Sequence, residues 1–155
     1  MSQYSNISGK IRQKSYTMQP NRSCAVRPLS SKKSAVVVDD DIDIITVLKN
    51  GLEQNNYEVH AFANPLKAVE YLKSVGSPQI LITDLRMPGM TGFELVREVR
   101  KHHPDMGIIV MTAFDVNKSE FEKVLPSTKI DALINKPISI RKLIDAANAI
   151  YVSKR

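Results

Sequence analysis

From Ala35 onward, short apolar runs alternate with longer amphipathic stretches, and this alternation restricts the possible folds more than any other feature of the chain. Each run is rich in Val, Ile or Leu and is bounded by polar residues, which is typical of a buried strand. We therefore predict five strands, at Ala35–Val38, Glu58–Phe62, Ile80–Thr83, Ile108–Met111 and Ala132–Asn135.

The stretches between these runs have the spacing of amphipathic helices. The first places Ile44, Ile45, Leu48 and Leu52 on one face, and the second begins at Asn64-Pro65, a typical helix start with Asn as the N-cap. The expected helices are Ile42–Gln54, a helix from Pro65 to near Gly76, Phe93–Lys101, Asn117–Leu125, and a last helix capped by Ser139 that carries Ile140 to Ile150.

Strands that alternate with helices indicate an α/β fold with a parallel sheet covered by helices on both faces. For five such units the doubly wound, flavodoxin-like strand order 2-1-3-4-5 is expected. Ligands of these folds bind beyond the carboxyl ends of the strands, so the chemistry of the chain is expected at that edge.

Polar residues directly follow four of the predicted strands: Asp39-Asp40-Asp41, Asp84, Thr112 and Lys136. Carboxylates of Asp39, Asp40 and Asp84 would repel one another unless a cation lies among them. Mg²⁺ prefers such oxygen ligands together with waters and a phosphate. With Lys136 and Thr112 beside them, the group could position a phosphoryl group for transfer, and a carboxylate can itself be the nucleophile.

Each of these residues also has a purely structural interpretation. Acidic residues at strand ends often cap the next helix, as Asp41 could here. A Thr after a strand or a Lys-Pro dipeptide is individually uninformative. Only their joint placement at four strand ends favours a functional site.

The motifs at this edge resemble those of response-regulator receiver domains. Val36 to Asp41 is similar to the opening of that family, and Asp84-Leu85-Arg86-Met87-Pro88-Gly89-Met90-Thr91-Gly92 is similar to the segment that carries its phospho-acceptor. Met111-Thr112-Ala113 and Lys136-Pro137 resemble the two remaining sites. The resemblance covers about residues 34–152, and the Asp84–Gly92 segment is its most specific part.

The resemblance implies a signalling switch rather than a turnover enzyme. Its donor would be a phosphohistidine on a sensor histidine kinase or phosphotransfer protein, and phosphate would be lost slowly. The implied roles are phospho-acceptor for Asp84, direct Mg²⁺ ligands for Asp40, Asp84 and the backbone carbonyl of Arg86, metal support for Asp39, phosphoryl contacts for Thr112 and Lys136, and a cis peptide at Lys136-Pro137.

Two departures from the family pattern and one pair of side chains distinguish this chain within the resemblance. The family's usual aromatic switch position, three residues before the lysine, holds Leu133, and Leu125–Ile130 lacks the common Gly-Ala turn. Arg86 and Phe114 occupy positions that tune phosphate loss in the family. We expect the guanidinium of Arg86 to stack on the ring of Phe114 and to slow hydrolysis.

The basic excess of the chain lies in its first quarter. Residues 1–38 hold seven of the 22 Lys and Arg residues and no Asp or Glu. The rest of the chain therefore has 15 basic and 16 acidic residues. With little apolar content, residues 1–33 are expected to form a disordered basic tail before a receiver domain at 34–155. The one cysteine, Cys24, excludes a disulfide within the chain, and no apolar run is long enough to span a bilayer. A cytoplasmic protein is expected.

Two other functions compete with this interpretation. The basic tail could contact nucleic acid phosphates, although only Tyr4 and Tyr16 could stack on bases. A hydrolase that forms an aspartyl phosphate would need a second carboxylate two residues after its nucleophile, where this chain has Arg86. Because the sequence ends soon after the last helix, we expect output through a separate partner protein.

Overall fold

The computed structural model describes residues 32–76, 78–115, 117–124 and 126–155. The predicted basic tail lies outside the described residues, apart from its last two positions. Among the residues described, no helix is long and apolar enough to cross a membrane.

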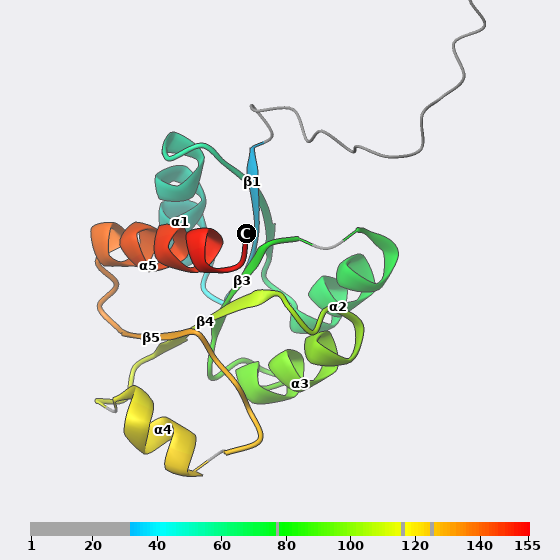
Figure 1. Ribbon diagram of the computed structural model, residues 1–155, viewed down its shortest axis with the longest axis vertical. Coiled ribbons are helices and arrows are strands. Elements are labelled where there is room, and N and C mark those ends of the chain that lie inside the picture. The colour runs from blue at the N-terminus through cyan, green and yellow to red at the C-terminus, as the bar shows by residue number, and fades with distance from the viewer. Residues whose placement is uncertain (1–31, 77, 116, 125) are drawn as a thin grey trace, which may run out of the picture. The chain divides into compact units, whose positions relative to one another are not determined.

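Five parallel strands form one sheet in the order β2-β1-β3-β4-β5, which confirms the predicted flavodoxin-like topology (Figure 1). The central strands are buried along most of their length because helices cover both faces. The strands are β1 (Lys33–Val38), β2 (Tyr57–Phe62), β3 (Ile80–Asp84), β4 (Gly107–Thr112) and β5 (Ala132–Asn135).

β1 begins at Lys33, earlier than the predicted start at Ala35. The Lys33 ammonium donates a hydrogen bond of 2.7 Å to Asn148 Oδ1 and lies 5.0 Å from the ring centroid of Tyr57. These contacts let a charged residue join the strand.

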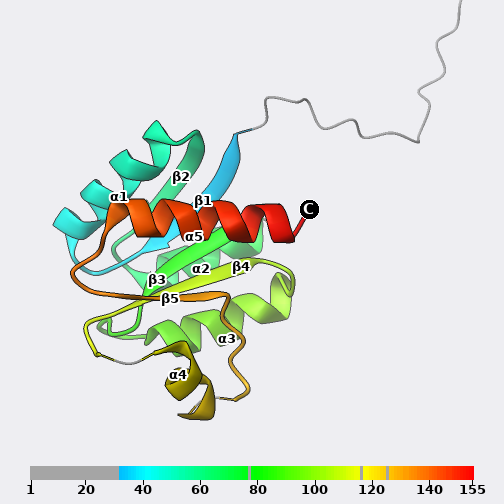
Figure 2. The same ribbon diagram turned by 60° about the vertical axis from the view of Figure 1, so that its left-hand side comes forward.

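The helices follow the strands in alternation and pack in two layers. α1 and α5 share one apolar cluster with the sheet, while α2 and α3 share another on the opposite face (Figure 2). Their bounds are α1 (Ile42–Gln54), α2 (Pro65–Ser74), α3 (Gly92–His102), α4 (Lys118–Val124) and α5 (Ile140–Ser153).

Side-chain caps begin α1, α2 and α5 where the sequence predicted them. Asp41, Asn64 and Ser139 are the N-caps of α1, α2 and α5, and each accepts a backbone N–H of the first turn. Thr91 and Glu94 form a reciprocal capping box at the start of α3. These caps determine where the loops at the carboxyl edge of the sheet end.

α4 is the shortest helix and begins after the predicted Asn117. The Asn117 side chain accepts the Glu120 N–H at 2.9 Å, and the Glu120 carboxylate accepts the Asn117 N–H at 3.2 Å, so Asn117 precedes the helix as a cap. Phe121 packs on Phe93 of α3, with ring centroids 4.9 Å apart. A cavity of about 720 Å³ lies between α4, β5 and α5.

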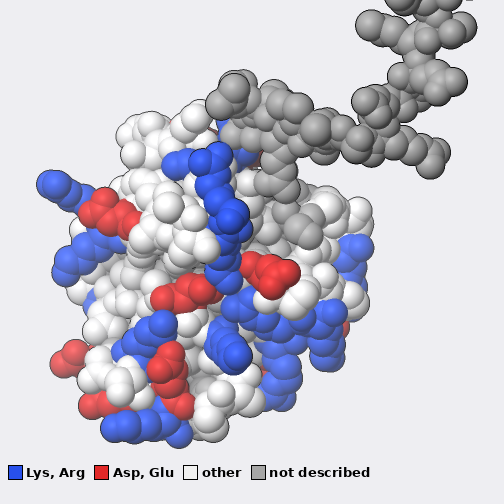
Figure 3. Space-filling view, viewed as in Figure 1, with Lys and Arg blue, Asp and Glu red and all other residues white. Residues whose placement is uncertain are grey.

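The segment before β5 is held by polar contacts to α3, β4 and α5. Arg100 donates to the carbonyl of Lys129 at 3.0 Å. Asp131 accepts the Ile108 N–H at 2.8 Å and pairs with Lys154 at 3.4 Å. Basic and acidic side chains are interspersed on the face drawn in Figure 3.

Candidate functional site

The carboxyl ends of four strands bring the predicted polar residues to one edge of the sheet. Asp39 directly follows β1, Asp84 ends β3, Thr112 ends β4 and Lys136 directly follows β5. Because the strands are parallel, their last residues lie at the same edge, as the topology required.

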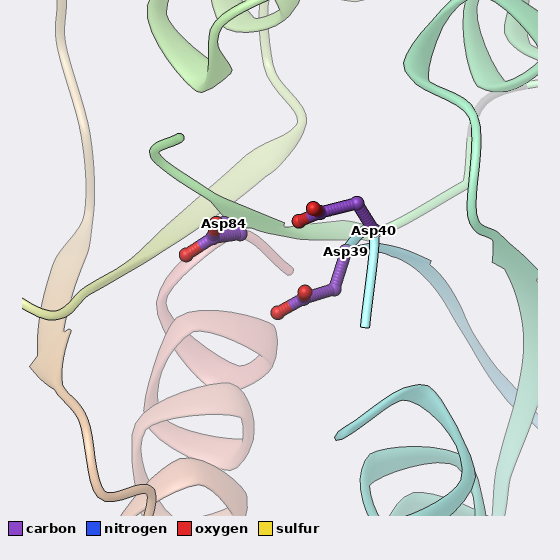
Figure 4. A group of neighbouring side chains, drawn as sticks. All are labelled: Asp39, Asp40 and Asp84. Atoms are coloured by element: carbon purple, nitrogen blue, oxygen red, sulfur yellow. The ribbon is translucent and has the colours of Figure 1, made fainter. Parts of the chain in front are cut away.

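Three carboxylates form the centre of this site. Oxygen atoms of Asp39, Asp40 and Asp84 all lie within 4.8 Å of one another, and Figure 4 shows the three side chains extending into one region from the ends of two neighbouring strands. The side chains of Asp39 and Asp84 are buried, whereas Asp40 is exposed. An all-oxygen donor set with one side open to solvent fits a hard cation such as Mg²⁺, which keeps several of its waters.

Lys136 contacts two of these carboxylates. Its Nζ lies 3.0 Å from Asp39 Oδ2 and 3.0 Å from Asp84 Oδ1. The peptide bond to Pro137 is cis, as predicted.

Burial and charge act in opposite directions on the ionisation of this group. Burial raises the pKa of Asp39, and the hydrogen bonds from the Asp41 N–H and from Lys136 only partly offset it. Burial alone would lower the pKa of Lys136, but hydrogen bonds to Asp84 and Asp39 and the charges of both raise it. Lys136 is therefore firmly cationic, whereas burial destabilises the ionised form of Asp39.

The backbone around Asp84 is held by β4 and by the start of α3. The Leu85 N–H donates to the carbonyl of Met111 at 3.0 Å, and the Gly92 N–H donates to the carbonyl of Leu85 at 2.9 Å. A Cβ atom on Gly92 would lie 2.3 Å from the carbonyl oxygen of Asp84. Only glycine therefore allows α3 to begin this close to the end of β3.

Thr112 and two larger side chains border the site. Thr112 is buried, and its Oγ1 accepts the Phe114 N–H at 3.0 Å. The guanidinium carbon of Arg86 lies 4.3 Å from the centroid of the Phe114 ring, which confirms the predicted stack. The backbone of β5 joins the same corner, because the Lys136 N–H donates to the Thr112 carbonyl at 2.7 Å.

Leu133 lies away from this group, on β5. It is partly buried against the apolar cluster shared with α2 and α3, and it also lines the cavity beside α4. Its effect on switching stays a prediction.

An apolar groove next to the site was not anticipated from the sequence. Its volume is about 290 Å³, and it lies between α1 and the segment after β5, sharing Lys136 with the acidic group. Ile42 and Val47 of α1 are 60% and 54% exposed, on the side of the helix away from the predicted buried face. Of these two, Val47 lines the groove, and as an apolar residue off the predicted core face it was the available signal. The groove is lined by Asp43, Ile44, Val47, Leu48, Lys136, Pro137 and Ile138.

Comparison with known proteins agrees with this geometry. The family model described as response regulator receiver domain matches residues 35–148. The fold is similar to a CheY-like response regulator receiver domain protein from Methanospirillum hungatei JF-1, with a TM-score of 0.71, 27% identity, and coverage of 80% of this chain and 97% of that chain.

Two further solved structures are similar. The response regulator protein TrrA from Thermotoga maritima, in complex with Mg²⁺-BeF, has a TM-score of 0.66 and 30% identity over 76% of this chain and 98% of that chain. A response regulator receiver domain protein from Clostridium thermocellum has a TM-score of 0.67 and 24% identity over 78% of this chain and 95% of that chain, and supports the fold alone.

Proposed function

Because the chain belongs to the family of response regulator receiver domains, we propose that it takes a phosphoryl group onto Asp84 in a two-component phosphorelay. The observation that carries this proposal is the setting of Asp84. Its carboxylate ends a buried strand, lies in a group with two other carboxylates, and is 3.0 Å from an ammonium. Such a carboxylate is placed to act as a nucleophile toward phosphorus.

In the proposed reaction an oxygen of Asp84 forms a bond to phosphorus as the bond from phosphorus to the donor's histidine nitrogen breaks. The electron pair of the broken bond stays on the imidazole. Transfer of this kind depends mainly on positioning and on charge neutralisation. Lys136 neutralises one phosphoryl oxygen, and the Thr112 hydroxyl donates to another.

The acidic group fits a magnesium ion. Asp40, Asp84 and the backbone carbonyl of Arg86 would bind it, and Asp39 would support it from its buried position. When bound, Mg²⁺ neutralises charge that develops on the phosphoryl oxygens. The neighbour from Thermotoga maritima, crystallised with Mg²⁺ and BeF, supports this assignment.

The donor is proposed to be a histidine kinase or a phosphotransfer protein. Asp84 is only 6% exposed, so a donor must cover the rim of the site to deliver its phosphoryl group. The groove beside Lys136 and the exposed Ile42 and Val47 offer an apolar surface for that contact. The domain then acts as a cytoplasmic signalling switch toward a separate, unidentified output protein, and not as a turnover enzyme.

Phosphorylation by a small-molecule donor tests the acceptor. Incubation of the protein with acetyl phosphate and Mg²⁺ should add one phosphoryl group by intact mass, and Asp84→Asn should abolish the gain. Asp41→Asn is the matched control, because it removes a neighbouring carboxylate while Asn still caps α1. Full mass gain in Asp84→Asn would show that another residue is the acceptor.

A further inference from the structure

We propose that the amino edge of the sheet binds the phosphate backbone of a nucleic acid strand. This edge lies opposite the acidic site and is formed by the starts of β1, β4 and β5 together with the ends of α3 and α5. The proposal concerns a second surface of the domain and does not depend on phosphorylation of Asp84. We call this surface the basic edge, and among the described residues its Lys and Arg side chains are Lys32, Lys33, Arg100, Lys101, Lys129, Lys154 and Arg155.

The basic edge concentrates positive charge on a domain that is close to neutral. Residues 1–31 contain five of the 22 Lys and Arg residues and no Asp or Glu, so residues 32–155 have 17 basic and 16 acidic residues. In the described part of the basic edge, seven cations lie with three acidic side chains, those of Glu98, Asp105 and Asp131. In Figure 3, Lys and Arg side chains run down the middle of the drawn face, over the end of the chain marked C in Figure 1.

The cations around Asp131 exceed the charge that this carboxylate can neutralise. The carboxylate lies 3.6 Å from a terminal nitrogen of Arg100 and 3.4 Å from Lys154 Nζ. Arg100 also donates to the Lys129 carbonyl at 3.0 Å, which holds the backbone of Lys129 beside this group. One carboxylate thus faces two cations, with a third on the same loop, and the remaining positive charge attracts an anionic partner.

The ends of helices favour cations even without a ligand, but this accounts for only part of the basic edge. Arg100 and Lys101 lie in the last turn of α3. Lys32 and Lys129 lie outside the helices, and Arg155 follows the C-cap of α5. These last three side chains are exposed, and among the described residues they make no ion pair with a carboxylate. They are therefore available to phosphate groups.

Tyr151 places an aromatic ring among these cations. Lys33 Nζ and the guanidinium carbon of Arg155 each lie 5.2 Å from the centroid of the ring. Lys33 is fixed in this position by its 2.7 Å hydrogen bond to Asn148 Oδ1. Proteins that bind single strands combine cations along the backbone with aromatic side chains on which bases stack. The basic edge offers both groups, whereas a carboxylate-rich protein partner would use the cations alone.

The sequence that leads into the basic edge adds charge of the same sign. The five Lys and Arg residues of residues 1–31 precede Lys32 with no acidic residue between them. A nucleic acid repeats its negative charge along its whole length, so each added cation releases a further condensed counterion and strengthens binding. A polyanion of this kind therefore fits the chain better than a protein surface with a few carboxylates.

Binding of the full-length chain to a fluorescein-labelled single DNA strand of mixed sequence, followed by anisotropy at several salt concentrations, tests the proposal. Each phosphate contact to a single strand contributes about 0.7 to the slope of log affinity against log salt. Removal of three contacts should therefore reduce this slope by about 2. The edge variant that removes them is Lys32→Gln/Lys129→Gln/Arg155→Gln.

A matched control removes the same charge at the opposite edge of the sheet. Its three residues lie in the first turns of α2 and α5, at the end of the domain that carries the acidic site. At about 0.15 M salt the Debye length is about 8 Å, so charges at that distance from the basic edge contribute little to binding. The slope should stay at the wild-type value in the control variant Lys67→Gln/Arg141→Gln/Lys142→Gln.

A wild-type slope in the edge variant overturns the inference, even where the full chain binds DNA, because the contacts then lie outside the described part of the basic edge. Equal losses in the two triple variants also overturn it, since net charge alone would explain them. Binding to polyglutamate or to anionic phospholipid vesicles without binding to DNA overturns it in favour of another partner.

The rate of mass gain with acetyl phosphate and Mg²⁺ separates this inference from the proposed function. The edge variant should gain mass at the wild-type rate, because its substitutions lie at the edge of the sheet opposite Asp84. Should the triple variant not fold, Lys129→Gln and Arg155→Gln are measured singly, and each should lower the slope by about 0.7. Unchanged slopes in both single variants refute the inference, whatever the outcome of phosphorylation.

Discussion

Replacing Gly92 by alanine should damage both stability and phosphorylation, because α3 begins against the backbone of the acceptor strand. The new Cβ would lie 2.3 Å from the Asp84 carbonyl oxygen and 3.0 Å from Leu85 Cα, and both are backbone atoms that no rotamer change can move. Overpacking of this kind costs about 1–3 kcal/mol. Alanine regains up to about 1 kcal/mol through its helix propensity.

The balance is a net loss of about 1–2 kcal/mol, which for a domain of this size lowers the melting temperature by roughly 5–8 °C. The backbone must also shift at Asp84, and a misplacement of about 1 Å can slow a positioned reaction by about 100-fold. Thermal unfolding and the rate of mass gain with acetyl phosphate measure the two effects.

Two other glycines provide controls. A Cβ on Gly76 meets nothing within 4 Å, so Gly76→Ala should not destabilise the domain. A Cβ on Gly51 meets only the Ile140 side chain, at 2.7 Å from Cγ2, so it should cost less than the change at Gly92. If Gly92→Ala melts at the wild-type temperature and reacts at the wild-type rate, the close approach of α3 to the Asp84 carbonyl does not constrain this position.

Three further predictions concern the charged groups of the site. Millimolar Mg²⁺ should stabilise the wild type, by about 2.7 kcal/mol at 100 times the dissociation constant. In thermal melts, Asp40→Asn should lose most of the rise in melting temperature that Mg²⁺ gives the wild type. An equal rise in both proteins would exclude Asp40 from the metal site. Because burial raises the pKa of Asp39, its contribution to stability is present at low pH and is lost as the pH rises through that pKa. Without Mg²⁺, Asp39→Asn should therefore melt above the wild type at about pH 7, with the gap narrowing toward about pH 4; a constant gap would contradict the titration. Arg86→Asn and Phe114→Glu should each lose phosphate several-fold faster than the wild type, where a tenfold change equals about 1.4 kcal/mol of barrier; equal rates by intact mass would show that the stacked pair does not shield the phosphoryl group from water.

Most of the fold could be predicted because its signals are local. Runs such as Ile80–Thr83 indicate strands by their composition, and the caps Asn64 and Ser139 mark helix starts by their own hydrogen bonds. The predicted bounds were wrong where contacts with residues distant in sequence set the end of an element. Lys33 joins β1 through Asn148 and Tyr57, which are far away in sequence, and no local pattern reports them.

The positions of the candidate site residues could likewise be predicted, since each follows a strand and parallel strands end at one edge. Their mutual geometry could not. Spacing does not reveal that Lys136 lies equally close to Asp39 and Asp84, nor that Gly92 is required by the Asp84 carbonyl. The groove beside Lys136 was also missed, because it depends on how α1 packs beside the segment after β5.

Under the proposed function, the position of Lys136 has a consequence for how a phosphoryl group would be received. An ammonium carries three N–H donors, and here two of them are engaged by Asp39 and Asp84 at 3.0 Å each. The third is available to an incoming phosphoryl oxygen without either existing bond being broken. The main cation of the site is thus already oriented before a donor arrives, and little reorganisation energy has to be supplied at the moment of transfer. Under the proposed function, the Lys136 side chain is therefore preorganised and need not rearrange to receive the phosphoryl group.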